Sequence, residues 1–245
     1  MAKLTEVTSA NAVFTLDSDG VLGVLEHLSV RADQPTPATW TVTMQRGELF
    51  AQPSLVVGDR RYRPGDGTQA GTFRISRGTR GISFDWLQPD GARSVRIGYR
   101  LALVGTAYTD VVDLRVPVWE GDWPAPVREL TAALNLPRVP RGQIIVWVEP
   151  RPVGTTIATT RKQIRLRARD VDARTPLTLH TVLPRNVLSS LDGVNVQDKP
   201  GLAAILAERR GSDRTWWPWA LAAGLAIAVS AVAFRTARLH RPLRR

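Results

Sequence analysis

The stretch "SVRIGYRL", residues 94–101, carries the pattern that decides the fold class. Apolar residues at every second position, from Val95 to Leu101, alternate with residues that include Arg96 and Arg100. A period of two places successive side chains on opposite faces of a β-strand. The stretch therefore predicts a strand with one face in a core and the other in solvent.

The same alternation recurs along the chain and is clearest in "QIRLRAR", residues 163–169. Turn signals such as "RPGDG" and "PDG" separate the runs. About ten such segments predict a mainly β protein containing a β-sandwich. We assign this sandwich to residues 10–184, with an alternative division into two subdomains near 137–141 and an N-terminal extension at 1–9. The other predicted strands lie at 21–30, 38–45, 72–76, 81–87, 110–118, 127–136, 143–149 and 175–183.

The pattern changes after Pro184. Residues 185–215 form a linker in which "PGLAAILAERRG" predicts a short helix, with Pro200 at its start and Gly211 at its end. Residues 216–234, "WWPWALAAGLAIAVSAVAF", contain no charge and begin with three tryptophans. At ~1.5 Å per residue they are long enough to cross a hydrocarbon core of ~30 Å. We therefore predict one C-terminal transmembrane helix, followed by a basic tail at 235–245.

Small residues in this segment would let another helix approach closely in the bilayer. This composition predicts a helix-packing face and membrane-protein partner subunits. The predicted face comprises Ala223, Gly224, Ala226, Ser230 and Ala231.

Five arginines follow the predicted span, whereas Arg209, Arg210 and Arg214 precede it. The positive-inside rule then predicts a cytoplasmic C-terminus and places residues 1–215 outside the cytoplasm. An exported domain needs a signal sequence, and the opening "MAKLTEVTSANAVF" has no apolar core of that length. We expect an upstream signal; the alternative is a tail-anchored protein with a cytoplasmic domain.

The charge and the motifs exclude several function classes. The formal charge is +11, and the five arginines after Phe234 leave +6 spread over 234 residues, which does not indicate nucleic-acid binding. The absence of cysteine excludes thiol catalysis and disulfides. No phosphate-loop, dinucleotide, zinc-protease or serine-hydrolase motif occurs, so we expect no cofactor and no metal.

The stretch "TLDSDGVLGVLE", residues 15–26, resembles part of a calcium-binding EF-hand loop. However, Thr15 stands at the first ligand position, and the flanking segments are rich in β-formers rather than helical. Asp19-Gly20 is a dipeptide typical of tight hairpins. We predict a β-hairpin here and expect Glu26, within its second strand, to face solvent.

Two groups of residues are candidates for chemistry or binding. Arg165, Arg167 and Arg169 share one predicted strand face. Solvated protection of a sheet edge is one interpretation, and an anionic partner, either lipid headgroups or an envelope polymer, is the other. The second group could form a carbohydrate site in which two carboxylates act between stacking aromatic rings, the alternative being a turn with packed tryptophans. It comprises Trp119, Glu120, Asp122 and Trp123.

Several segments together resemble the domain-of-unknown-function 2207 family of predicted bacterial membrane proteins. They are "FTLDSDGVLGVLEHLSV", "FRIS", "GARSVRIGYRL", "DLRVPVWEGDWPAPVRELTAALNLP" and "PLTLHTVLP", in this order between residues 14 and 184. The resemblance implies a β-rich extracytoplasmic domain followed by a membrane span, and it implies no established activity.

The sequence thus predicts a single-pass protein of the bacterial cell membrane. We expect a non-enzymatic interaction module that is a subunit or accessory factor of an envelope assembly. The alternative is an envelope enzyme that acts on carbohydrate through Glu120 and Asp122.

Overall fold

A computed structural model describes residues 6–120, 126–150, 152, 154–173 and 175–214. These residues are mainly β-strands, as the sequence predicts, and the strands form three sheets. The largest sheet has eight strands, and neighbouring strands are antiparallel except for β1 and β12, which pair in parallel. Its order is β14 (Thr156–Thr159), β15 (Gln163–Val171), β12 (Val127–Asn135), β1 (Glu6–Leu16), β2 (Leu22–Ala32), β9 (Gly91–Ala102), β4 (Leu49–Val57) and β5 (Arg60–Arg61).

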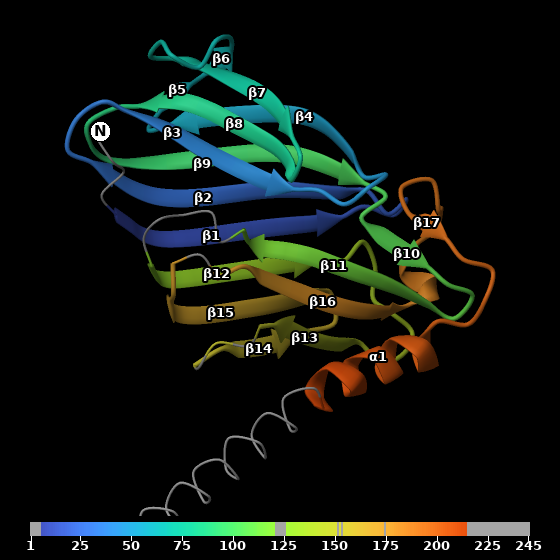
Figure 1. Cartoon of the computed structure of the whole chain (residues 1–245). Helices are drawn as coiled ribbons and strands as arrows, with labels where there is room; N and C mark the ends of the chain where they lie inside the picture. The colour runs from blue at the N-terminus through green and yellow to red at the C-terminus, as the bar shows by residue number, and fades with distance from the viewer. Residues whose placement is uncertain (1–5, 121–125, 151, 153, 174, 215–245) are drawn as a thin grey trace, which may run out of the picture. The chain divides into compact units, whose positions relative to one another are not determined.

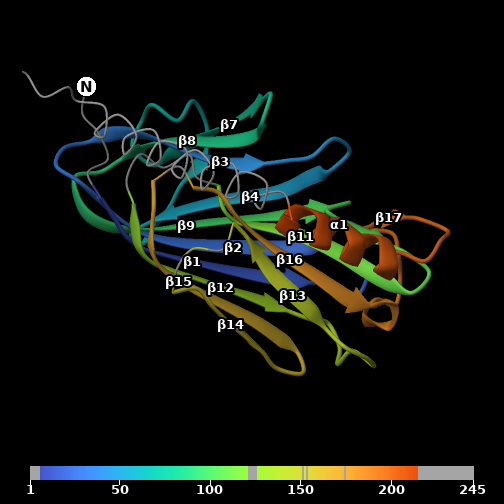
Figure 2. The same ribbon diagram turned by 60° about the horizontal axis from the view of Figure 1, so that its bottom comes forward.

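Two smaller sheets form the other layer of the sandwich, packed against one face of the eight-stranded sheet (Figure 1). Figure 2 shows β11, β16 and β13 in front of β12 and β15. One small sheet has the order β13 (Ile145–Glu149), β16 (Leu177–Pro184), β11 (Val111–Trp119), β10 (Gly105–Ala107) and β17 (Asn195–Val196). The other has the order β3 (Thr36–Thr43), β8 (Gly81–Gln88), β7 (Thr72–Gly78) and β6 (Arg63–Pro64).

Aromatic contacts join the layers. The Phe84 ring of β8 lies 6.2 Å from Tyr99 of β9 and 6.0 Å from Phe50 of β4, measured between ring centroids. Trp40 of β3 and Trp119 of β11 meet edge to face at 5.7 Å, which connects the two smaller sheets. Burial of these large apolar surfaces at ~25 cal/mol per Å² is the main drive that holds the sheets together.

All ten strands expected from alternation are present within a few residues of their predicted bounds. The strands that the alternation missed are β5, β6, β10, β14 and β17, which have four residues or fewer, β4, and β1, which only the hairpin prediction implied. In β4, Gln52 has φ +52° and the pairing with β9 shifts register between Ala51 and Ser54. Such a bulge interrupts the period of two, which explains why β4 was not recognised.

The predicted hairpin at residues 15–26 is confirmed, because β1 and β2 pair in antiparallel fashion on both sides of it. The loop runs over residues 17–21, longer than the two-residue turn expected, and Gly20 has φ +92°. The Asp19 carboxylate accepts a hydrogen bond from the Val21 amide at 3.1 Å, and Asp17 pairs with Arg100. Both carboxylates therefore hold the loop in place.

Residues 185–200, expected to be part of a linker, lie against the sandwich. The 3-10 helix η1 (Arg185–Val187) buries Val187, and β17 extends the five-stranded sheet. Gly193 donates to the Asp19 carbonyl at 2.9 Å, and a Cβ at this glycine would lie 2.7 Å from the Val21 amide nitrogen. This close approach requires glycine.

The chain beyond Pro200 forms a second unit. Its helix α1 (Leu202–Arg214) confirms the predicted helix and continues three residues past Gly211. Of the helices in the described part of the chain, none combines the length and apolar character that crossing a bilayer requires. The predicted span at 216–234, its packing face and the basic tail lie outside the described residues.

Candidate functional sites

The three arginines predicted to share a face do so. Arg165, Arg167 and Arg169 are exposed along β15, and the residues between them point into the core. The Arg167 guanidinium forms an ion pair with Glu129 of β12 at 2.7 Å. Arg165 donates through Nε to the Gln163 side chain at 2.5 Å. Arg165 and Arg167 are thus solvated and individually anchored.

Arg165 and Arg167 line a shallow cavity of about 460 Å³ on the outer face of the eight-stranded sheet, which we call the arginine cavity. Its other polar walls come from three neighbouring strands. Asn11 of β1 donates to the Thr131 hydroxyl of β12 at 2.6 Å, and Thr156 of β14 lines the opposite side. All charged groups that line this cavity are cationic.

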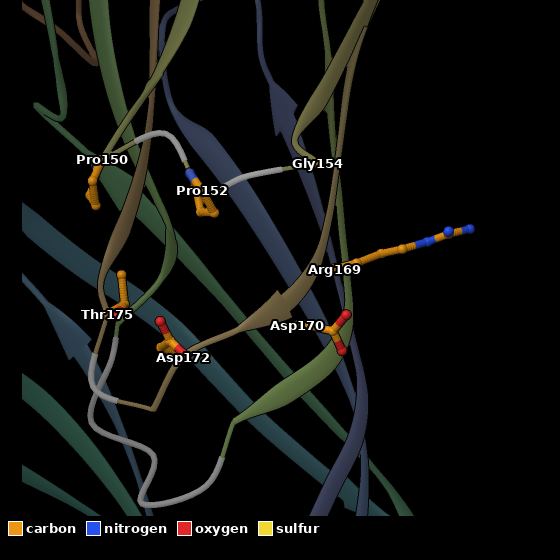
Figure 3. A pocket seen from close by; sticks show the side chains of 7 residues that line it. All are labelled: Pro150, Pro152, Gly154, Arg169, Asp170, Asp172 and Thr175. Atoms are coloured by element: carbon orange, nitrogen blue, oxygen red, sulfur yellow. The ribbon is translucent and has the colours of Figure 1, made fainter.

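Arg169 belongs to a different hollow of about 620 Å³. Figure 3 shows that its guanidinium extends away from the other labelled side chains, which include Asp170 and Asp172. The wall is built from the β13–β14 connection and the end of β15, next to residues 151, 153 and 174, which lie outside the described residues. Arg169 therefore shares the exposed face of β15 with the other two arginines but lines a different hollow.

The arginine cavity continues into a broad exposed surface. Strand pairing aligns Arg167, Thr131, Asn11, His27 and Arg96 in one row across β15, β12, β1, β2 and β9. All five side chains are exposed or half-exposed. We call this row and the adjacent one the outer sheet face. The adjacent row is Arg165, Ala133, Val13, Leu25 and Gly98.

A second cavity, of about 460 Å³, has the opposite character. It lies where the β3–β4 connection meets the ends of β11, β13 and β16. Three glutamates, Glu48, Glu120 and Glu149, line it together with one arginine, Arg115. We call it the glutamate cavity. Thr43, Gln45, Pro117, Trp119, Pro176 and Thr178 complete its wall.

Each glutamate accepts a hydrogen bond from a neutral N–H donor. The amides of Gln45 and Thr43 donate to Glu48 and Glu120 at 2.8 and 3.0 Å, and the Trp147 indole donates to Glu149. Burial raises the pKa of Glu48, and the Gln45 amide partly offsets this. Within the described residues, neither Glu48 nor Glu149 has an ion-pair partner.

Arg115, in the wall of the glutamate cavity, lies 3.7 Å from the Asp113 carboxylate, whose other oxygen contacts His180. Both His180 and Asp113 are buried, and the Trp147 ring packs on the imidazole with 3.9 Å between centroids. His180 is thus a packed residue of the interior. The buried pair fixes the strands that form the cavity wall.

The expectation that Glu26 faces solvent is wrong. Its side chain lies inside the sandwich with a relative exposure of 7%, where it accepts a hydrogen bond from the Tyr99 hydroxyl at 2.5 Å. Burial raises the pKa of Glu26 from 4.5 to about 8. The Tyr99 bond opposes this shift, repulsion by Glu120 adds to it, and the Trp40 indole opposes it weakly. Glu26 is therefore mainly protonated at neutral pH.

Of the predicted carbohydrate group, Trp119 and Glu120 line the glutamate cavity, and Asp122 and Trp123 lie outside the described residues. Trp119 is only 2% exposed and packs on Trp40, so its ring faces the core rather than solvent. Its Nε1 has no hydrogen-bond partner among the residues described. Packing of Trp119 corresponds to the turn interpretation of this segment.

Sequence reasoning missed the polar residues that complete the arginine cavity. Asn11 and Thr131 are 120 residues apart in the sequence, and Thr156 lies in the short strand β14. Only the pairing of these strands in the folded chain brings the three residues together. Glu26 could have been found, because the period of two places it in register with buried Val24. In the part of the chain that the structure describes, no three acidic or histidine side chains group to hold a metal ion.

The family comparison identifies the chain. Residues 6–183 match the family described as predicted membrane protein (DUF2207), N-terminal domain. The match covers most of the chain, which therefore belongs to this family, and it confirms the resemblance found in the sequence. No curated protein matches the chain.

Solved structures match the chain weakly and in part. A putative nutrient binding protein from Legionella pneumophila is 10% identical, with a TM-score of 0.45, and the match covers 72% of this chain and 66% of that protein. Yeast LTA4 hydrolase is 8% identical, with a TM-score of 0.47, and the match covers 72% and 28%. An M1 zinc metallopeptidase from Deinococcus radiodurans is 12% identical, with a TM-score of 0.37, and the match covers 72% and 42%. The chain thus matches only part of each protein's length, and at these scores none of them indicates an activity.

Proposed function

We propose that this member of the DUF2207 membrane-protein family is a non-enzymatic interaction module. It serves as a subunit or accessory factor of a bacterial envelope assembly, attached to the cell membrane by its C-terminal segment with the sandwich outside the cytoplasm. The outer sheet face contacts the partner. The observation that carries the proposal is the exposure of two adjacent rows of side chains across five paired strands.

The geometry of this face suits association. At ~4.8 Å between strands, five strands span roughly 20 Å, which is on the scale of one side of a protein interface. The centre carries short side chains and Leu25, which is 46% exposed, and arginines lie toward both sides. Of the two central rows, Ala133, Val13 and Leu25 are apolar and Thr131, Asn11 and His27 are polar, and protein interfaces combine both kinds of surface.

The test places a photo-crosslinking amino acid at Leu25 in the native host. Val139, in the β12–β13 connection, is the matched control because it is 45% exposed and lies away from this face. We expect one reproducible protein adduct from position 25, absent from position 139 and lost when Arg96→Glu places a like-sized negative charge on the face. Mild maltoside extraction followed by sizing and mass spectrometry should recover the same partner. A lone monomer with no adduct at position 25 would contradict the proposal.

A second candidate, an envelope enzyme acting on carbohydrate, is favoured by one observation: Glu120 shares its cavity with Glu48 and Glu149. Glycosidases need a pair of carboxyl groups about 5 to 10 Å apart. In the sequence, Asp122 was the proposed second acid. Release of reducing sugar from cell-wall polysaccharide by the purified chain, abolished by Glu120→Gln or Asp122→Asn, would support the enzyme against the interaction module.

A further inference from the structure

We propose that the arginine cavity binds a phosphodiester group, the unit shared by phospholipid headgroups and phosphodiester-linked envelope polymers. This inference rests on the proposed function, because it assigns an anionic ligand to one part of the outer sheet face, beside the protein partner. Two guanidinium groups two residues apart on one strand face bracket the cavity, with their Cα atoms ~6.7 Å apart along β15.

Both guanidinium groups are oriented before any ligand arrives. Gln163 accepts from the Arg165 Nε and is itself held, since its amide donates to Asn135 at 2.7 Å. Glu129 holds one terminal nitrogen of Arg167. A guanidinium carries five N–H donors, so each arginine keeps donors for a ligand after making these contacts. Such preorganisation lowers the entropic cost of binding.

The uncharged walls add donors and room. The Thr131 oxygen accepts from Asn11, so its own hydroxyl hydrogen is left to donate to another group. Thr156 supplies a second hydroxyl, and Ala133 and Ala158 leave an apolar surface beside them. A carboxylate is planar and is satisfied by one guanidinium fork, whereas a phosphate presents oxygens in several directions. The apolar surface suits the carbon atoms that flank a diester.

The charge of the site matches one phosphodiester. Arg165 and Arg167 supply two positive charges, and Glu129, paired with Arg167, offsets one of them. The net charge near +1 complements the single negative charge of a diester. Guanidinium is weakly hydrated and matches phosphate geometry, so arginine is better suited to this role than lysine.

Binding is measured by phosphorus NMR with the full chain in dodecyl maltoside, a detergent that contains no phosphorus. The probe is glycerophosphoglycerol, whose resonance should broaden and shift as protein is added. We expect Arg165→Gln and Arg167→Gln each to weaken binding about tenfold, and Arg165→Lys to weaken it less. The matched control is Arg74→Gln on β7, an exposed arginine that is paired with a carboxylate as Arg167 is but lies outside the cavity, and it should leave the affinity within twofold.

A further variant guards against a trivial loss of folding. Ala133→Glu places a carboxylate among the lining residues, opposite Arg165, and should abolish binding while thermal unfolding stays close to that of the parent chain. Two more arms identify the source: phosphatidylglycerol added to the micelles, and poly(glycerol phosphate). Tighter binding of the lipid indicates the membrane surface, and tighter binding of the polymer indicates an envelope polymer.

No binding of any of these probes, or binding that the Arg165 and Arg167 variants leave unchanged, overturns the inference. That failure is distinct from failure of the interaction module, because the crosslink at Leu25 does not depend on a phosphodiester. A crosslink without phosphodiester binding keeps the module and removes this ligand.

Discussion

The arginine cavity and the glutamate cavity have about the same volume, but they belong to different layers of one sandwich. They also differ in how their charged side chains are exposed to solvent. In the first, guanidinium groups stand on the exposed side of a sheet, and Arg167 is half exposed. Water solvates them, and their partners only orient them. In the second, carboxylates approach the core, and burial already raises the pKa of Glu48.

The consequence is that pH changes the charge at the glutamate cavity but not at the arginine cavity, and that substitutions in the two regions change different properties of the protein. Arginine stays charged at every pH the protein meets. Glu120 lies close enough to Glu26 to raise its pKa further, so charge at the glutamate cavity is coupled to the buried interior. Substitutions near the glutamate cavity should therefore change stability, whereas substitutions at the arginine cavity should change binding. Three measurements test this difference.

The largest effect is expected at Glu26. Its carboxyl is neutral in the folded chain up to pH about 8 but ionises near pH 4.5 when unfolded. The folded state therefore binds one more proton between these values, and stability present below pH 4.5 is lost as pH rises toward 8. We expect the free energy of unfolding to fall by roughly 1.4 kcal/mol per pH unit between pH 5 and 7 through this group. Glu26→Gln should remove that slope.

Urea unfolding of the full chain in maltoside at pH 5, 6 and 7 measures the slope for both proteins. Glu129→Gln is the matched control, because it makes the same chemical change at a glutamate whose side chain is 46% exposed. It should retain the slope of the parent chain. Parallel pH profiles for the parent and Glu26→Gln would mean that Glu26 is not the neutral buried group described above.

A smaller effect is expected at Asp113, whose carboxylate lies 3.7 Å from Arg115 of the glutamate cavity. Asp113→Ala removes the partner of the His180 ring nitrogen, which stays buried at 5% side-chain exposure. An unsatisfied buried polar group costs about 1 to 3 kcal/mol. Asp59→Ala, at an exposed loop position, should change the free energy of unfolding by less than ~0.5 kcal/mol. Equal effects of the two alanine variants in urea unfolding would rule out a structural role for the buried pair.

The contrast between the cavities also shows what the sequence could and could not predict. The alternation in β9 and β15 is local, so it identified both strands and the shared face of the three arginines. The parallel pairing of β1 with β12 joins segments more than a hundred residues apart, and no local pattern predicts that Asn11 donates a hydrogen bond to Thr131. This pairing decides which arginines form a cavity.

The prediction that Glu26 faces solvent was wrong for a different reason. A glutamate within a strand usually faces solvent, because burying a charge is costly. Here the position in the alternation outweighs that preference, and the carboxyl avoids the cost by remaining protonated and bonding to Tyr99. The pattern of the strand was a better guide than the residue type. The partners Tyr99 and Trp40 come from other strands and were beyond a sequence argument.

The smallest effect on stability is expected at Arg167. Its pair with Glu129 is close, at 2.7 Å, but both side chains are about half exposed, so solvent screens the attraction. Arg167→Gln should therefore lower the free energy of unfolding by less than ~1 kcal/mol, and the loss should shrink as salt is raised to ~0.5 M. A double-mutant cycle of Arg167→Gln with Glu129→Gln, followed by urea unfolding, isolates the pair, and we expect a coupling energy of ~0.2 to 1 kcal/mol. A coupling energy above ~2 kcal/mol that is insensitive to salt would place Arg167 in the same class as the buried groups. The arginine cavity would then contribute to stability as the interior does, and the distinction between the two regions would no longer hold.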